Sequence, residues 1–178
     1  GHSKTGRLNV GEHFAFALLK GCLQISAFPP INCWVDLTPV DYVARAIVDL
    51  AWMPESVDGV FHITNPDPLH STQMFAWFRS FGYRFDVLAM DEWLDKLIRD
   101  EGFTGNALYP YLALLEEFGE HNFQLPRYEC QRTTRALAAS GVSCPPVDDR
   151  LLACYTEYFI ETGFMPPPEQ RRAGAHGK

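Results

Sequence analysis

The first six residues have side chains that could bind a phosphate group. Gly1 to Gly6 reads Gly-His-Ser-Lys-Thr-Gly, a polar loop with a glycine at each end and a basic residue inside it. A P-loop needs four residues between its glycines and then Lys followed by Ser or Thr. Arg7 and Leu8 follow the second glycine here, so the loop departs from the P-loop pattern.

Signature motifs of several enzyme classes are missing from the sequence. It has no GxGxxG for a dinucleotide, no HExxH for zinc, no GxSxG for a nucleophilic serine and no Tyr-x-x-x-Lys for proton transfer to a carbonyl. Adjacent acids on a helix point apart, so Asp91–Glu92 and Glu116–Glu117 are typical of a solvated face. We therefore predict no catalytic and no metal-ligating residue, and the chain does not look like a complete enzyme.

The composition narrows the class of protein. With 178 residues, of which 47% are hydrophobic, the chain is long enough to bury the core of one domain or of a small domain with a satellite. The net charge of −7 argues against nucleic-acid binding. No apolar run is long enough to span a bilayer, and the start does not resemble a signal peptide. We expect a cytoplasmic protein with neither nucleic-acid nor membrane contacts.

The cysteines favour the same compartment. Their number is odd and no CxxC pair occurs, which predicts reduced thiols and neither a disulfide framework nor a zinc site. The five are Cys22, Cys33, Cys130, Cys144 and Cys154.

The stretch from Trp34 to Ala51 is expected to organise the fold. Trp34 to Leu37 reads as a buried strand, and Pro39 then breaks the backbone before an amphipathic helix. Asp41 stands in the first turn of this helix, where a capping role is favoured. The apolar face is predicted from helical spacing, with Arg45 and Asp49 toward water; its members are Val43, Ile47, Leu50 and Ala51.

Other strands and helices alternate through the first half of the chain. Strands are predicted at Val60–Asn65 and at Tyr83–Leu88. A helix is predicted from an Asn9 cap, with Glu12 reaching back, through Cys22, and another from a Ser71 cap to Gly82. This alternation favours parallel pairing at the edge of an α/β sheet.

The second half is predicted to be helical. Helices are expected over 91–100, 106–118, 128–139 and 147–163, with no strand between Asp91 and Phe164. The fold class is therefore an α/β edge of two or three short strands with helices, followed by a mostly helical lobe. We expect three regions, namely an α/β segment at 1–90, a helical lobe at 91–165 and a disordered tail at 166–178.

Several segments, taken in order, resemble the C-terminal part of thioester reductase domains. These domains end some nonribosomal peptide synthetases, polyketide synthases, aminoadipate reductases and carboxylic acid reductases. The resemblance covers the chain up to about Phe164. It rests on Gly-His-Ser-Lys-Thr-Gly, on Val35 to Ala44, on Phe61-His62-Ile63-Thr64-Asn65-Pro66, and on the later Gly82-Tyr83, Met90 to Trp93, Asn106-Ala107-Leu108 and Cys144-Pro145.

The resemblance implies a piece of an extended short-chain dehydrogenase/reductase. In that family an N-terminal Rossmann half carries the NADPH loop and the catalytic Ser/Thr, Tyr and Lys, while the C-terminal part shapes the substrate pocket. The reaction releases an acyl or peptidyl thioester, held on the phosphopantetheine arm of a carrier protein, as an aldehyde or alcohol. The sequence begins just downstream of where the catalytic Tyr and Lys would lie, so NADPH is not expected to bind this piece alone.

Residue roles follow from the same resemblance. The first loop would pass the junction of cofactor and substrate, with Gly1 and His2 near the cofactor and Ser3, Lys4 and Thr5 near the substrate. Trp93, Phe103 and Tyr109 are candidates for lining the acyl channel, against the alternative that they are core. Candidates for the phosphate of the arm or for an acidic carrier protein are Lys4, Arg7, Arg127, Arg132 and Arg135, which in the alternative are solvated helix faces.

Two other functions compete with this one. The chain could be a non-catalytic module that docks a carrier protein, or part of another extended reductase or epimerase acting on a nucleotide sugar or a steroid. The long helical lobe counts against the second alternative. The sequence immediately before Gly1 discriminates between enzyme and docking module, because only the enzyme requires a glycine-rich fingerprint and a Tyr-x-x-x-Lys there.

Overall fold

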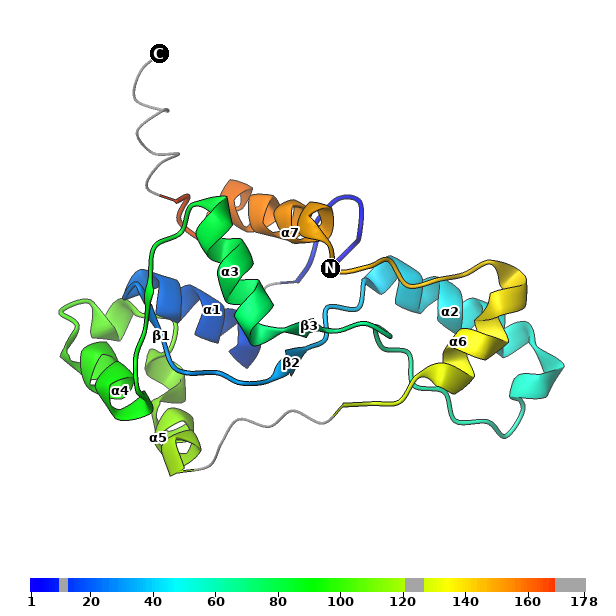
Figure 1. Cartoon of the computed structure of the whole chain (residues 1–178), viewed down its shortest axis with the longest axis horizontal. Helices are drawn as coiled ribbons and strands as arrows, with labels where there is room; N and C mark the ends of the chain where they lie inside the picture. The colour runs from blue at the N-terminus through cyan, green and yellow to red at the C-terminus, as the bar shows by residue number, and fades with distance from the viewer. Residues whose placement is uncertain (10–12, 121–126, 169–178) are drawn as a thin grey trace, which may run out of the picture. The chain divides into compact units, whose positions relative to one another are not determined.

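The computed structural model describes residues 1–9, 13–120 and 127–168. These residues form two compact units, each built from segments that are far apart in the sequence (Figure 1). Of the described residues, unit 1 comprises 1–9, 34–70 and 127–158, and unit 2 comprises 13–33, 71–120 and 159–168.

Unit 1 is built on two helices that pack against each other. They are α2 (Val40–Trp52) and α6 (Gln131–Leu137), the latter continued by a 3-10 turn at Ala138–Ser140 (Figure 1). The core between them is small and consists of Tyr42, Ala46, Leu50, Leu137 and Val142. The predicted helix is therefore present, but its buried face is rotated, because Ile47 is 53% exposed and Ala51 is also exposed.

The strands of unit 1 are short. β2 (Trp34–Val35) pairs antiparallel with β3 (Leu69–His70), with Trp34 opposite His70. The predicted strand at Val60–Asn65 is wrong, since this segment joins no ladder. Side chains bond to its backbone instead: Thr133 Oγ1 donates to the His62 carbonyl at 2.7 Å, and the Asn65 N–H donates to Asp36 at 3.3 Å.

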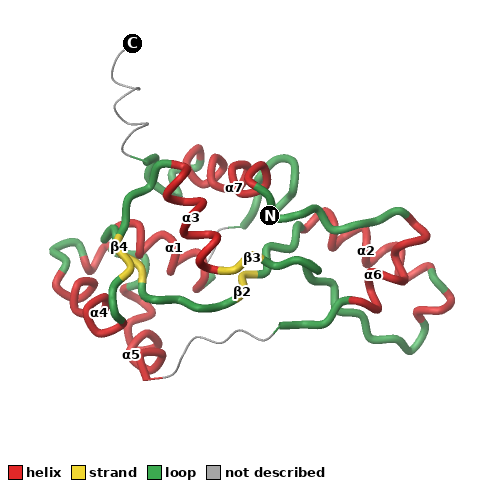
Figure 2. The backbone as a smooth tube through the Cα atoms, in the orientation of Figure 1, coloured by secondary structure: helices red, strands yellow, loops and turns green. Residues whose placement is uncertain are grey.

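Unit 2 carries most of the aromatic core. β1 (Ala27–Phe28) pairs parallel with β4 (Asp86–Val87), as the predicted alternation favoured, although β1 itself was not predicted (Figure 2). The Phe28 ring lies 5.0 Å from the Phe75 ring and 4.7 Å from the Phe85 ring. Its helices are α1 (Phe14–Gln24), α3 (Ser71–Phe81), α4 (Met90–Arg99) and α5 (Leu112–Glu120).

The last helix, α7 (Asp149–Glu161), contributes residues to both units. Leu151, Leu152 and Tyr155 are buried in the part assigned to unit 1, and Phe159 in the part assigned to unit 2. Among the described residues from 91 to 164 there is no strand, as predicted. The remaining short 3-10 helices are Pro54–Ser56, Phe103–Gly105 and Tyr109–Tyr111.

Several predicted helix ends differ in the structure. Ser71 does begin α3, and its hydroxyl donates to the Ile31 carbonyl at 2.8 Å and accepts the Cys33 N–H at 3.3 Å. The helix predicted from Asn106 becomes regular only at Leu112, because the Asn106 side chain donates to the Gly21 carbonyl at 3.1 Å. Glu12 lies outside the described residues, so its predicted contribution to a helix start is not seen.

The end of the described chain is packed. Pro166 accepts a hydrogen bond of 2.8 Å from the Tyr83 hydroxyl, and Pro168 is buried. Residues 169–178, most of the tail predicted to be disordered, lie outside the described part.

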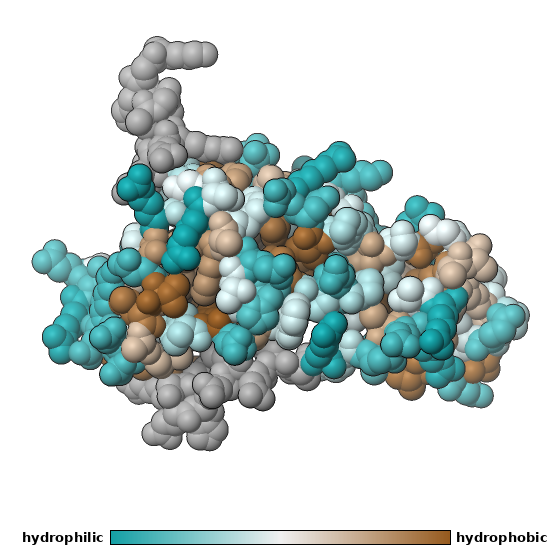
Figure 3. All heavy atoms as spheres, viewed as in Figure 1, coloured by the Kyte–Doolittle hydropathy of each residue, from teal (hydrophilic) through white to brown (hydrophobic). Residues whose placement is uncertain are grey.

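No helix in the described ranges is long and apolar enough to cross a bilayer. All five cysteines are free thiols. Hydrophobic side chains reach the surface in several places on the face seen in Figure 3.

Candidate functional site

The N-terminal loop is a closed turn whose shape depends on Gly6. The His2 N–H donates to the Arg7 carbonyl at 2.9 Å, and the Gly6 N–H donates to the His2 carbonyl at 3.0 Å. Gly6 has φ +67°, and a Cβ there would lie 2.4 Å from the Cys154 carbonyl oxygen. Only glycine fits such a close approach with a positive φ.

Asp41 fastens this loop to the first turn of α2. Its carboxylate accepts the Ser3 N–H at 2.8 Å and the Ser3 hydroxyl at 2.6 Å. The residue at the helix N-cap is Pro39, with no side-chain cap bond, so the favoured role of Asp41 as a simple cap is wrong. Burial acts to raise the pKa of Asp41, but the hydrogen bonds from Ser3, together with that of its own backbone N–H and the charge of His2, outweigh it and leave that pKa below its ordinary value.

A second fastening holds the start of the loop. The Gly1 carbonyl accepts the Val40 N–H at 2.9 Å and the Tyr155 hydroxyl at 3.0 Å. Burial, with smaller contributions from Asp41, Cys154 and Cys144, raises the pKa of Tyr155 to about 12, so this phenol is neutral and a donor at pH 7. The loop is thus held in one position within unit 1.

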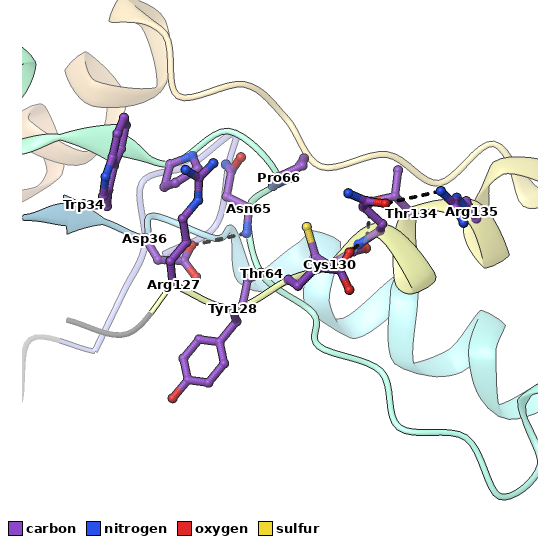
Figure 4. A pocket seen from close by; sticks show the side chains of 13 residues that line it. Trp34, Asp36, Thr64, Asn65, Pro66, Arg127, Tyr128, Cys130, Thr134 and Arg135 are labelled. Atoms are coloured by element: carbon purple, nitrogen blue, oxygen red, sulfur yellow. Dashed lines mark hydrogen bonds between the residues drawn. The ribbon is translucent and has the colours of Figure 1, made fainter.

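A cavity of about 840 Å³ opens in the same unit and is shown in Figure 4. Two guanidinium groups, two carboxylates, four aromatic or proline rings and several small polar groups surround it. In that view Trp34 and Arg127 lie at one side of the cavity and Arg135 at the other. The lining residues are Trp34, Asp36, Thr64, Asn65, Pro66, Pro68, Arg127, Tyr128, Glu129, Cys130, Gln131, Thr134 and Arg135.

The charged residues of the cavity are positioned by stacking and hydrogen bonds. The Arg127 guanidinium lies over the Trp34 ring, 5.2 Å from its centre, and the His70 ring meets the same indole edge-on at 5.0 Å. Arg135 donates to Gln131 one turn earlier in α6 at 3.2 Å. Asp36 accepts from the Asn65 N–H and from the Thr38 hydroxyl. Stacking of this kind leaves the guanidinium N–H groups free to meet an anion.

One polar atom in the cavity lining has no partner. The Thr64 hydroxyl oxygen is buried and makes no hydrogen bond within the described residues. A buried hydroxyl without a partner is uncommon, because desolvation is not compensated. This position is therefore suited to a hydrogen bond from a ligand that enters the cavity.

One thiol of unit 1, that of Cys144, packs against the core of this unit and is not set up for nucleophilic chemistry. Burial, with added repulsion from Asp36, Cys130 and Asp41, raises the pKa of Cys144 to about 12. A thiol with that pKa is protonated at pH 7 and is a weak nucleophile. No group of three or more His, Cys, Asp or Glu suited to a metal occurs in the part of the chain that the structure describes. The arrangement can bind an anionic or amide-containing ligand by charge, stacking and hydrogen bonds.

The structure brings together some predicted site residues and separates others. Gly1, His2, Ser3, Lys4 and Thr5 share the loop of unit 1; the Lys4 N–H donates to His2 Nδ1 at 3.2 Å, and the Thr5 hydroxyl accepts the Arg7 N–H at 3.4 Å. The Lys4 and Thr5 side chains are exposed. Their assigned roles stay predictions.

Trp93 belongs to the core of unit 2. Its side chain is 1% exposed, and its indole N–H donates to the Ala27 carbonyl at 3.1 Å. Phe103 and Tyr109, the other channel candidates, contact each other edge-on at 5.2 Å in the same unit. Among the described residues Trp93 has the surroundings of a packing residue, and its role in substrate binding stays a prediction.

The cavity contains both predicted and unpredicted residues. Arg127 and Arg135 line it, whereas Arg132 stacks over Phe61 at 4.7 Å outside the lining. Sequence reasoning missed Asp36, Thr64 and Asn65 as site residues. A signal for them was present, because each is a small polar residue at the end of an apolar extended stretch, where binding residues often lie.

The arrangement defines a helix-rich protein with few short strands and a ligand-sized cavity in its first unit. Comparison with known proteins shows which proteins this chain is similar to. No protein-family model matches the chain. A linear gramicidin synthase of Brevibacillus parabrevis is 26% identical over 92% of this chain, and L-2-aminoadipate reductase of Schizosaccharomyces pombe is 27% identical over 94%. The chain spans only 3% and 12% of the lengths of these two relatives.

Solved structures agree with these matches. The terminal R domain from the myxalamid PKS-NRPS biosynthetic pathway superposes with a TM-score of 0.84 at 35% identity, over 95% of this chain and 43% of that one. A thiolation-reductase di-domain from an archaeal non-ribosomal peptide synthetase shares the fold, with a TM-score of 0.72 at 20% identity over 92% of this chain and 34% of the other. The resemblance seen in the sequence is confirmed: the chain is related to the reductase domains of nonribosomal peptide and polyketide synthases, and corresponds to the C-terminal part of such a domain.

Proposed function

We propose that this chain is the substrate-binding portion of an NADPH-dependent thioester reductase of the extended short-chain dehydrogenase/reductase type. The observation that carries the proposal is the match to one terminal R domain at 35% identity over 95% of the chain, while the chain spans 43% of that domain. The remainder of such a domain would be an N-terminal Rossmann half. The substrate would be an acyl or peptidyl thioester on a carrier protein, released as an aldehyde or alcohol.

NADPH would touch this chain only at one edge of the cofactor. The sequence has no glycine-rich nucleotide fingerprint, so the nucleotide would be held by the Rossmann half. Bound there, NADPH supplies the hydride for the reduction. Gly1 and His2 would border the cofactor, and Ser3, Lys4 and Thr5 the substrate. Support comes from the fixed position of their loop, which is held by Asp41, Val40 and Tyr155.

The cavity of unit 1 would receive the phosphopantetheine arm. Arg127 would meet its phosphate, since guanidinium groups pair well with phosphate oxygens. Arg135, at the other side of the cavity, is the alternative contact for that phosphate. The arm also carries amide groups, and the unpartnered Thr64 hydroxyl offers one of them a hydrogen bond. A volume of about 840 Å³ lies within the range of small-molecule and cofactor sites.

The test compares two polypeptides. One is residues 1–178, and the other carries in addition the encoded sequence upstream of Gly1. Both receive NADPH with an acyl group loaded on the carrier protein, and NADPH oxidation and aldehyde release are measured. We expect turnover by the longer chain and none by residues 1–178. A longer chain that binds the loaded carrier protein but neither binds nor oxidises NADPH would contradict the proposal and favour the non-catalytic docking module.

A further inference from the structure

Helix α2 carries a second apolar face that the described residues leave uncovered. Of its 13 residues, seven are exposed, and six of these seven are apolar, with Arg45 the exception. Trp52 is 84% exposed, and Ile47 and Val48 are each more than half exposed. We call this set the α2 stripe; its members are Val40, Ala44, Ile47, Val48, Ala51 and Trp52.

The stripe has the geometry of a packing face. At 100° per residue its six members fall within about 140° of the helix circumference. The buried residues Tyr42, Ala46 and Leu50 lie on the opposite side and pack in the core of unit 1. A helix that is apolar on two sides is typically buried on both, and a contiguous exposed apolar patch marks an interaction surface.

The start of the chain lies at one end of this stripe. The Val40 N–H donates to the Gly1 carbonyl, so Gly1 is next to the first turn of α2. The polypeptide that precedes the matched segment in a complete reductase domain would therefore arrive beside the stripe. In the terminal R domain that this chain matches, more than half of the domain lies outside the match.

We propose that the α2 stripe is the surface on which the nucleotide-binding half of the reductase domain packs. This inference rests on the proposed function, which supplies that half as the partner. Interfaces between parts of one polypeptide commonly combine an apolar centre with a charged rim. Arg45 and Asp49 border the stripe on one side and would form part of such a rim.

The test measures the solvent exposure of the stripe with and without the upstream sequence. Hydroxyl-radical footprinting reports the modification rate of Trp52 in residues 1–178 and in the longer chain. We expect a rate at least about fivefold lower in the longer chain, because burial removes access of the radical to the indole. An equal rate in both chains would overturn the inference, and so would a Trp52 that is already protected in residues 1–178.

A pair of matched variants adds a second measurement. Val48→Glu places a charge in the stripe, and Val57→Glu places the same charge at another exposed valine outside α2. In the longer chain we expect Val48→Glu to weaken the docking of the two halves, seen as faster proteolysis between them, and Val57→Glu to have no such effect. Equal behaviour of the two variants would overturn the inference, as would a dimer of the longer chain that Val48→Glu dissociates.

The test of the α2 stripe and the test of the proposed function can give different results. NADPH binding by the longer chain tests the reductase assignment, whichever surface joins its halves. A longer chain that binds NADPH and leaves Trp52 exposed refutes the stripe alone. A longer chain that does not bind NADPH refutes the reductase, and the docking proposal with it.

Discussion

The two units differ in what holds them together. Unit 2 is packed by large rings, with Phe28, Phe75 and Phe85 in mutual contact and Trp93 fully buried in the same unit. Unit 1 has a core of few and smaller side chains, and much of its order comes from polar contacts such as Ser3 to Asp41. Unit 1 also carries the loop, the cavity and the α2 stripe. Stability is thus concentrated in one unit and binding features in the other.

The largest expected effect lies in unit 2. Trp93→Ala removes a buried indole and its hydrogen bond to Ala27, and we expect the free energy of unfolding to fall by about 3–5 kcal/mol. Trp52→Ala is the matched control in unit 1. The Trp52 side chain is 84% exposed, so we expect its removal to lower the free energy of unfolding by about 0.5 kcal/mol or less. Urea unfolding of both variants measures the difference. Equal losses would contradict the assignment of Trp93 to the core.

The next effect concerns the loop of unit 1. Gly6→Ala would place a Cβ 2.4 Å from the Cys154 carbonyl oxygen at a positive φ, and we expect a loss of about 3 kcal/mol in unfolding free energy. Gly141→Ala has a similar φ of +69° but open space around it, so only the strain of about 1 kcal/mol applies. Thermal unfolding compares the two. A Gly6→Ala variant no worse than Gly141→Ala would show that the loop does not pack closely on α7.

A smaller effect tests the polar fastening. Asp41→Asn weakens two hydrogen bonds from Ser3, and we expect a loss of about 1 kcal/mol at pH 7, reduced by solvent screening. The folded pKa of Asp41 lies below its ordinary value of 3.8, so the folded state binds fewer protons than the unfolded state. The stabilising contribution of the ionised Asp41 carboxylate to the free energy of unfolding is therefore present above about pH 4. It is lost as the pH falls through the pKa of Asp41 in the folded state.

The measurement for Asp41 is the difference in unfolding free energy between the wild type and Asp41→Asn across pH 7 to 3. We expect that difference to shrink at the acid end. Ser3→Ala and the double variant complete the cycle, and their effects should be non-additive because the two side chains bond directly. A difference independent of pH would show that the carboxylate charge contributes nothing.

The smallest expected effect on stability separates packing from binding. Arg127→Ala and Arg132→Ala each remove a guanidinium from an aromatic face, over Trp34 and Phe61, and each costs about 0.5 kcal/mol. Of these two arginines, Arg127 alone lines the cavity. In the longer chain we expect Arg127→Ala to raise the KM for loaded carrier protein about tenfold and Arg132→Ala to leave it unchanged, since a charged hydrogen bond to phosphate is lost in one case only.

Much of the helix content and part of the sheet were predictable from the sequence. β2 and β4 lie within the strands predicted at Trp34–Leu37 and Tyr83–Leu88, whereas β1 and β3 were not predicted. The predicted helices near 91–100 and 147–163 appear as α4 and α7, since their apolar spacing and flanking breaks are local signals. The alternation of Val60 to Asn65 predicted a strand, but its backbone groups are bound by Thr133 and Asp36, which are distant in the sequence. Such partners leave no local pattern.

The site was predictable only in part for the same reason. The loop was recognised from its residue types and Arg127 and Arg135 from their charge, but neither property reveals a shared cavity. Its wall joins Trp34, Asp36 and Asn65 to residues more than 60 positions away. The prediction that Ile47 is buried was wrong because α2 has two apolar faces, and the spacing of apolar residues alone does not say which face meets the core.

The contact between Gly1 and Tyr155 has a consequence for biosynthesis. These residues are 154 positions apart, and the helix that supplies Tyr155 also supplies Phe159 to the other unit. A ribosome delivers the chain from its N-terminus, so the opening loop waits for nearly all of the remaining residues before its hydrogen-bonding partner emerges. Premature termination before α7 would leave both units without their closing element, and such products are natural targets for chaperones and quality-control proteases.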